Sequence, residues 1–387
     1  MPVINRVADR AEEVAAWRRD FHSDPELLYE VHRTAAKVAD KLKSFGCDEV
    51  ATGIGRTGVV GVIRGRKNGG KVVGLRADMD ALPIEEATGL PYASKNPGKM
   101  HACGHDGHTA MLLGAARHLC DTRNFDGTAV VIFQPAEEGG AGAKAMIDDG
   151  MLDRFKIDEV FGLHNYPGLP VGSFAIRPGA LMAAADRVTI EVEGIGGHAA
   201  RPHLAIDTVL VGSEIVSALQ QIVARNVDPL ESAVVSITLF QAGFTDNVIP
   251  QTALLRGTAR TLKAETRDLV QKRIVEIAEG IARLHGAKAN VRYSRDYPVV
   301  VNDPGATDFA VSVARDIAGA DKVNPAAVPV MGGEDFAFML QARPGAFIFM
   351  GNGDTAPIHH PAYDFNDAAI PFGSSYWVRL VETALPT

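Results

Sequence analysis

The sequence predicts an α/β protein that carries an inserted second domain, and three observations support this. The chain has 387 residues, more than one hydrophobic core usually organises. Short apolar runs alternate with helical stretches, which is typical of an α/β domain with a mixed, largely parallel sheet. A middle segment instead has the order strand, helix, strand, strand, helix, strand, which is typical of a ferredoxin-like unit.

The first domain is expected to begin with a helix, because apolar residues recur at helical spacing from Val31 to Phe45 and Gly46 follows as a stop. Helices are also expected near residues 107–121 and 141–149. Buried strands are expected at four short apolar runs: Val72–Leu75, Ala129–Phe133, Val160–Leu163 and Phe347–Met350.

The inserted domain is expected over residues 184–296, which leaves residues 1–183 and 297–387 for the first domain. Its six elements give the pattern βαββαβ. They are a strand at 188–192, a helix at 206–227, strands at 233–241 and 253–262, a helix at 266–285 and a strand at 289–293.

Composition and charge exclude several classes of protein. The formal net charge of -8 argues against a nucleic-acid-binding protein, because phosphate contacts require a basic surface. No stretch is apolar for the roughly 20 residues that span a membrane, and residues 1–19 do not resemble a signal peptide. We therefore expect a cytoplasmic protein with small-molecule partners.

The chain has three cysteines, Cys47, Cys103 and Cys120. They are too few and too irregularly spaced for a disulfide framework, and their odd number leaves at least one unpaired. Cys103 is the informative one, because it lies among histidines.

Polar groups follow each of the four predicted strands, at the point where the strand ends. Ligands of open α/β sheets bind at the carboxyl ends of strands, so these groups are expected to converge on one site. They are Asp78 and Asp80, Glu137 and Glu138, His164, and His359 with His360.

The densest cluster is the segment His101–His108, which contains three imidazoles, a thiol and a carboxylate. These groups are typical ligands of Zn²⁺ and related ions. The alternative is an ordinary helix start capped by Asp106 or Thr109, with exposed histidines. The density of metal-competent groups within this short segment favours the metal site.

Three choices remain open from residue chemistry alone. Neighbouring side chains point apart, so one of Glu137 and Glu138 could bind metal while the other transfers a proton; both could instead be a solvated pair at a helix start. Nothing indicates which of His359 and His360 would bind metal. His198, on a glycine-rich loop, could contact substrate or lie in a surface turn.

The chain resembles the aminoacylase and carboxypeptidase family of metallohydrolases, in its hippurate hydrolase and indole-acetyl-amino-acid hydrolase branch. The matching segments run along nearly the whole chain. They are Gly74–Pro83, His101–Thr109, Gln134–Gly139, Gly162–His164, Gly196–His198, Asn247–Pro250, Gly332–Phe336 and Tyr363–Asp367.

The resemblance implies two divalent metal ions, Mn²⁺ or Zn²⁺ with Co²⁺ or Ni²⁺ as alternatives, because a thiolate favours softer ions while the branch is often manganese-dependent. It implies that Glu137 is the general base and that Asp78 orients a ligand imidazole. Substrate contacts are implied for His198, Asn247 and Arg260. The implied metal ligands are Cys103, His105, Glu138, His164 and His359.

The expected activity is hydrolysis of an N-acyl amino acid (N-acetyl, N-benzoyl or indole-acetyl type) to a carboxylic acid and a free amino acid, with His198 stabilising the oxyanion. A dipeptidase or an N-acyl-diaminopimelate deacylase is the alternative within the family. A metal-dependent binding protein without turnover is the alternative from another class, and Glu137 argues against it. The inserted domain is implied to be a lid and to form a homodimer or higher homo-oligomer.

Overall fold

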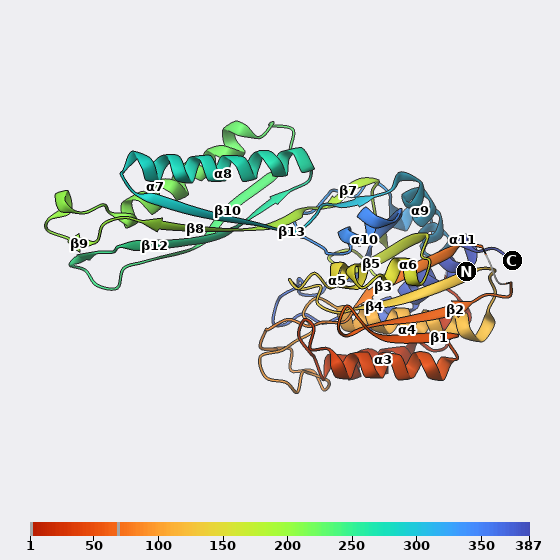
Figure 1. Ribbon diagram of the computed structural model, residues 1–387. Coiled ribbons are helices and arrows are strands. Elements are labelled where there is room, and N and C mark those ends of the chain that lie inside the picture. Colours follow the sequence, from red (N-terminus) through yellow and green to blue (C-terminus); the bar gives the residue numbers. More distant parts are fainter. Residues whose placement is uncertain (1–2, 68–69) are drawn as a thin grey trace. The chain divides into compact units, whose positions relative to one another are not determined.

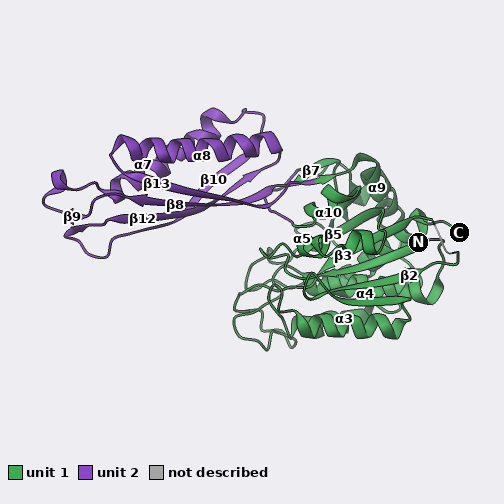
Figure 2. Ribbon diagram, viewed as in Figure 1, with its two compact units in different colours: residues 1–181, 301–328, 335–387 green, residues 182–300, 329–334 purple. Residues whose placement is uncertain are grey.

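The computed structural model describes residues 3–67 and 70–387 and divides the chain into two compact units (Figure 2). Unit 1 comprises residues 1–181, 301–328 and 335–387, and unit 2 comprises residues 182–300 and 329–334. The segment 329–334 joins unit 2 although it is distant from the rest of that unit in the sequence. No pattern in the sequence marks it, and we had expected it in the first domain.

Unit 1 is built on an eight-stranded mixed sheet in the order β1-β2-β4-β3-β5-β16-β6-β15 (Figure 1). The central strands β4, β3, β5 and β16 are mutually parallel, and β1 and β2 extend the sheet antiparallel. The strands are β1 (Glu49–Ile54), β2 (Gly58–Arg64), β3 (Val72–Asp78), β4 (Thr128–Gln134), β5 (Glu159–Pro167), β6 (Phe174–Ala175), β15 (Val323–Asn324) and β16 (Gly345–Gly353). The four central strands contain the four predicted apolar runs, so the predicted α/β class is confirmed.

Helices cover this sheet, and α4 lies against β3 with α2, α3 and α11 packed around it. As predicted, α3 ends at Phe45, and Gly46 caps it with a φ of 83°. The helices are α1 (Asn5–Ala8), α2 (Ala11–His22), α3 (His32–Phe45), α4 (His105–Thr122), α5 (Gly142–Asp148), α6 (Met151–Arg154), α9 (Pro304–Ala318), α10 (Ala337–Ala342) and α11 (Ile370–Ala384), with 3₁₀ turns at Ala320–Lys322 and Asp367–Ala369.

Unit 2 has a four-stranded antiparallel sheet in the order β10-β12-β8-β13. Its chain order is β8 (Ala184–Glu193), α7 (Thr208–Gln221), β10 (Ala233–Ala242), β12 (Thr252–Thr261), α8 (Ala264–Leu284) and β13 (Lys288–Tyr297), which confirms the predicted βαββαβ pattern. A π-helical turn (Ile222–Asn226) extends α7. Apolar residues of the sheet and both helices form a core of their own.

Short elements complete the chain. In unit 2, β9 (Gly197–His198) pairs with β11 (Val248–Ile249), next to a 3₁₀ turn at Pro202–Leu204. The strands β7 (Gly179–Met182) and β14 (Val300–Asn302) pair where the chain passes from one unit to the other. Among the described residues, none of the helices combines the length and apolar character needed to span a membrane.

Candidate metal centre

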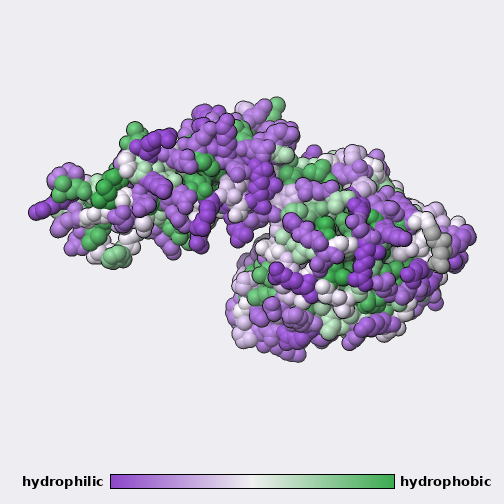
Figure 3. Space-filling model, in the orientation of Figure 1, coloured by the Kyte–Doolittle hydropathy of each residue, from purple (hydrophilic) through white to green (hydrophobic). Residues whose placement is uncertain are grey.

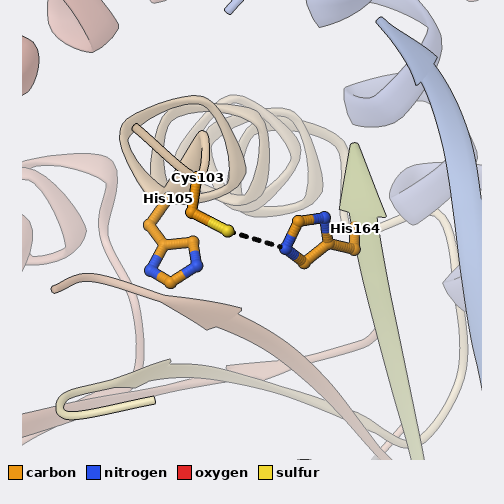
Figure 4. Close-up of side chains that lie close together, drawn as sticks. All are labelled: Cys103, His105 and His164. Atoms are coloured by element: carbon orange, nitrogen blue, oxygen red, sulfur yellow. Dashed lines mark hydrogen bonds between the residues drawn. The ribbon is translucent and has the colours of Figure 1, made fainter. Parts of the chain in front are cut away.

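The carboxyl ends of the central strands and the start of α4 bring together the predicted metal ligands of unit 1. Cys103 lies in the loop before α4, His105 is the first residue of α4, and His164 lies on β5 (Figure 4). The potential ligand atoms of these three buried residues all lie within 4.8 Å of one another. Cys103 Sγ is 3.4 Å from His164 Nε2.

The imidazoles of His105 and His164 are each held by a hydrogen bond to a main-chain carbonyl oxygen. His105 Nδ1 lies 2.8 Å from the carbonyl oxygen of Asp80, and His164 Nδ1 lies 2.6 Å from that of Asn165. A carbonyl oxygen only accepts, so each Nδ1 carries the hydrogen and donates it. In its neutral form each ring therefore has its lone pair on Nε2, which is the atom that faces the cluster.

Glu138 and His359 complete a second group of donors with Cys103, again within 4.8 Å of one another. Glu138 Oε1 is 3.5 Å from His359 Nε2 and 3.9 Å from His105 Nε2. His359 has a φ of 65°, and its backbone N–H donates to Ala102 O at 2.7 Å. This bond attaches the loop after β16 to the loop before α4.

His360 has different surroundings. Its side chain is exposed, and its Nδ1 accepts a hydrogen bond from the backbone N–H of Ala362 at 3.1 Å. Of the two neighbouring histidines, it is thus His359 whose ring nitrogen lies near the Glu138 carboxylate.

The charges of the cluster favour a bound cation. Burial raises the pKa of the Cys103 thiol well above its usual range, and the carboxylates of Glu138 and Glu137 raise it further. Burial lowers the pKa of His105, but Asp78 and Asp80 outweigh this effect and raise it to about 10. The surroundings therefore favour a positive charge at His105. A divalent ion would supply this charge and displace the protons of the imidazole and of the Cys103 thiol.

Two unsatisfied atoms test whether the donors fit a metal. His105 Nε2 and Glu138 Oε1 are both buried, and neither has a hydrogen-bond partner within residues 3–67 and 70–387. Such atoms are costly to bury unless something else contacts them. A thiol, imidazoles with free lone pairs and a carboxylate are also the donor types that zinc and related ions prefer, so the residues present fit the group.

Asp78 contacts imidazoles, as its predicted role requires. Its Oδ1 accepts a hydrogen bond from His108 Nδ1 at 2.6 Å, and its Oδ2 lies 3.6 Å from His105 Nε2. His108 Nε2 accepts from the backbone N–H of Asn165 at 2.9 Å, which fixes the tautomer of His108. Asp78 thus contacts His108, which was not a predicted ligand, and its Oδ2 also accepts a hydrogen bond from Arg76 Nη1 at 2.6 Å.

Asp80 has a role that our prediction did not assign. Its two carboxylate oxygens accept the backbone N–H groups of Glu137 at 2.9 Å and Glu138 at 3.1 Å. Asp80 is buried, and burial raises its pKa. One carboxylate thus fixes the backbone of both glutamates. The sequence places Asp80 at the strand end, but only the fold brings it to the glutamates.

A buried ion-pair network lies behind the loop that carries Cys103. Arg18 of α2 is fully buried; its Nη1 is 3.6 Å from Asp106 and 3.1 Å from Asp364, and its Nε donates to Asp367 at 2.8 Å. His22 Nδ1 lies 2.9 Å from the same Asp106 oxygen. The network connects the first turn of α4 with the segment that follows β16.

The predicted substrate residues lie in unit 2, at two opposite ends of its sheet. His198 pairs with Val248, and Asn247 accepts the backbone N–H of Ala199 at 3.0 Å, so His198 and Asn247 are close neighbours. Arg260 lies near the other end of β12. It is eight residues beyond the start of that strand, roughly 27 Å away at about 3.4 Å per residue.

Comparisons with known proteins agree with this architecture. The model of peptidase family M20/M25/M40 matches residues 74–383. The chain is 44% identical over 380 residues to hippurate hydrolase of Campylobacter jejuni, with 98% of each chain covered. It is 45% identical over 354 residues to N-acetyl-L-cysteine deacetylase of Bacillus subtilis, covering 91% of this chain and 83% of that protein.

A solved structure is similar over the same length. It is a Bacillus subtilis protein described as a dinuclear metal binding peptidase from the M20 family, with a TM-score of 0.84, 38% identity and coverage of 98% of this chain and 99% of that chain. The predicted family is confirmed by the matched model and by the relatives. The chain belongs to peptidase family M20/M25/M40 and is a hydrolase of that family.

Proposed function

We propose that this hydrolase cleaves the amide bond of N-acyl amino acids and releases a carboxylic acid and a free amino acid. The relatives named as hippurate hydrolase and N-acetyl-L-cysteine deacetylase support this substrate class. The observation that carries the proposal is a buried carboxylate, Glu137, beside the donor atoms of His105 and Glu138, all within 4.8 Å. Amide hydrolysis requires such a proton-transferring group next to the activating site.

In this proposal two divalent ions are held by Cys103, His105, Glu138, His164 and His359. Bound ions would supply Lewis acidity toward the amide carbonyl and lower the pKa of water to about 7. The thiol favours Zn²⁺, and the carboxylate and imidazoles also suit Mn²⁺. Asp78 orients imidazoles of the cluster, and its short contact with His108 supports this role.

Glu137 is the proposed general base. Its carboxylate takes a proton from the attacking water and delivers it to the nitrogen of the leaving amino acid. The hydrogen bonds that Asp80 accepts from the backbone N–H groups of Glu137 and Glu138 support a division of roles, because they fix the backbone from which the two side chains extend. Glu138 then remains a ligand while Glu137 stays available for proton transfer.

Substrate contacts are proposed for His198, Asn247 and Arg260, with His198 donating to the oxyanion of a partner subunit's site. Within unit 2, Arg260 lies roughly 27 Å by the strand rise from Thr252, where β12 begins shortly after the β9–β11 pair that holds His198. This separation supports the use of the two ends by different active sites.

A homodimer or higher homo-oligomer through unit 2 is part of the same proposal. The strand β10 is an edge of its sheet, and an unpaired edge can accept a strand of a second copy. Apolar residues lie at several places on the visible face of unit 2 (Figure 3), and Phe240 and Phe244 on and after β10 are 40% and 92% exposed. Such exposed apolar side chains support an interface.

The activity is tested with N-acetyl, N-benzoyl and indole-acetyl amino acids, dipeptides and N-acetyl-diaminopimelate. Each substrate is assayed after Mn²⁺, Zn²⁺, Co²⁺ or Ni²⁺ is restored to metal-stripped protein. We expect turnover of the N-acyl amino acids. Turnover of dipeptides alone, or of the diaminopimelate derivative alone, would instead identify a dipeptidase or a diaminopimelate deacylase. Metal binding without turnover of any substrate would favour a binding protein.

The shared site is tested by mixing His198→Ala with Glu137→Ala under conditions that exchange subunits. In a mixed dimer, the subunit that keeps Glu137 receives His198 from its partner, so one complete site forms. Activity should therefore reappear although each parent is inactive. Verified mixed dimers without activity would rule out a histidine that acts in the partner's site.

A further inference from the structure

Two cysteines outside the metal centre lie side by side at the ends of α3 and α4. Cys47 follows the Gly46 cap of α3, and Cys120 belongs to the last turn of α4. Their Sγ atoms are 3.6 Å apart. Both side chains are partly exposed, whereas Cys103 at the metal centre is buried.

Backbone bonds at the end of α3 hold Cys47 in a defined position. The N–H of Cys47 donates to Leu42 O at 3.2 Å and that of Gly46 donates to Lys43 O at 3.1 Å, which is the Schellman arrangement of a helix end. The next residue, Asp48, donates its N–H to Val62 O on β2 at 2.8 Å. The sulfur is therefore attached to a rigid junction of a helix and the sheet.

Arg123, the C-cap residue of α4, ties the two cysteine-bearing segments together. Its Nη2 donates to Gly46 O at 2.8 Å, and its Nη1 donates to Asp48 Oδ2 at 2.5 Å. These are the residues on either side of Cys47. The proximity of the sulfurs is thus maintained by a specific set of contacts around them.

We propose that Cys47 and Cys120 are a redox-active dithiol that forms a reversible intramolecular disulfide, a modification site separate from the metal centre. The sulfurs need to approach from 3.6 Å to about 2.05 Å, a small movement for side chains that can change rotamer. The hydrogen bond with Cys120 lowers the pKa of the Cys47 thiol; burial and Asp48 oppose this effect, and Arg123 adds to it. Cys47 is therefore the better nucleophile of the two.

The oxidant in this proposal is a low-molecular-weight disulfide. The Cys47 thiolate attacks one of its sulfurs, which forms a mixed disulfide and releases one thiolate that takes up a proton. The Cys120 thiol then loses its proton and attacks Cys47 Sγ, which releases the second small thiol. The sum is one protein dithiol and one small disulfide converted to one protein disulfide and two small thiols.

The disulfide should stabilise unit 1 without changing the metal centre. It would join positions 73 residues apart and so restrict the unfolded chain strongly. Cys120 is 15 residues from His105 along α4, about 22 Å at the helical rise of about 1.5 Å per residue. We therefore expect a higher Tm and unchanged turnover after oxidation.

The test uses the full, metal-loaded protein and oxidised glutathione as the probe. Intact mass measured without reductant should show the loss of two hydrogen atoms and no glutathione adduct. Peptide mapping should find Cys47 joined to Cys120. The Tm should rise by several degrees, and dithiothreitol should reverse both changes while kcat stays within about twofold of the reduced protein.

The variants Cys47→Ser and Cys120→Ser are the controls, because each keeps one of the two thiols. Cys120→Ser should retain a glutathione adduct on Cys47, since no second thiol can displace it. The same adduct stable on wild-type protein would refute the pairing, because the thiol would then react without forming the bond. Wild-type protein that keeps both thiols, or that joins either one to Cys103 or to a second chain, would equally overturn the proposal.

Discussion

Replacing Arg18 by methionine tests how the buried network behind the metal loop contributes to stability. Arg18 is fully buried, and it faces three carboxylates at distances of 3.6, 3.1 and 2.8 Å. Methionine keeps much of the apolar stem but removes the guanidinium. The carboxylates of Asp106, Asp364 and Asp367 would then share one fewer positive charge, and His22 would remain as the partner of Asp106.

The expected cost is about 3–5 kcal/mol, the range for breaking a buried ion pair by removing one partner. The hydrogen bond to Asp367 alone accounts for about 1.5–3 kcal/mol of this, because it joins two charged groups. The contact with Asp364 at 3.1 Å and the desolvated carboxylate of Asp106 account for the remainder. The measurement is the midpoint of urea unfolding, followed by a probe in unit 1.

Arg19→Met is the matched control, because Arg19 lies on the same helix and contacts the same Asp367 at 2.6 Å, but its side chain is 40% exposed. A surface pair contributes at most about 1 kcal/mol. The reasoning is wrong if Arg18→Met lowers stability no more than Arg19→Met does. Arg18→Lys should lower the stability by an intermediate amount, since lysine keeps the positive charge but lacks the planar guanidinium group that contacts several carboxylates.

Three further outcomes are expected. Glu137→Gln should retain both metals but lose at least ~10²-fold in kcat, and metal analysis beside kinetics distinguishes this from a lost ligand. Alkylation of Cys103 should be slow with metal bound and fast after chelation, as measured by mass spectrometry; equal rates would contradict coordination by its sulfur. Burial lowers the pKa of His22, but its hydrogen bonds and charge interactions with Asp106 and Glu86 together outweigh this and raise the pKa from 6.5 to about 9. Because the folded-state pKa is the higher one, this stabilisation is complete below about pH 6.5 and is lost as the pH rises through 9. The free energy of unfolding of His22→Gln, measured as a function of pH, should lack this part of the pH dependence.

Much of the fold and of the site could be predicted because the strongest signals are local. Each buried central strand appears as a short apolar run, and the residue after a run occupies the carboxyl edge of the sheet. The placement of Asp78, Glu138 and His164 near one another follows from that rule alone. The βαββαβ order of unit 2 followed from hydrophobic periodicity in the same way.

The rest depends on tertiary contacts that have no local signature. Asp80 reaches the backbone of Glu137 only because β3 and β4 are neighbours in register, with Asp78 opposite Gln134. The proximity of Cys47 and Cys120 could not be predicted, since nothing in the sequence shows that α3 and α4 end at the same place. Nothing in the sequence distinguishes Arg18 from an exposed charged residue. It is buried because α2, α4 and the last loops pack together around it.

The main-chain partners of His105 and His164 have a consequence for how this site can change over evolution. Asp80 and Asn165 engage the two Nδ1 atoms through their carbonyl oxygens, a group that every amino acid possesses. A side-chain replacement at either position would leave that acceptor in place as long as the local backbone keeps its path. The orientation of both rings is therefore protected from most point mutations, and the side chains around them are free to adapt to a different substrate or ion.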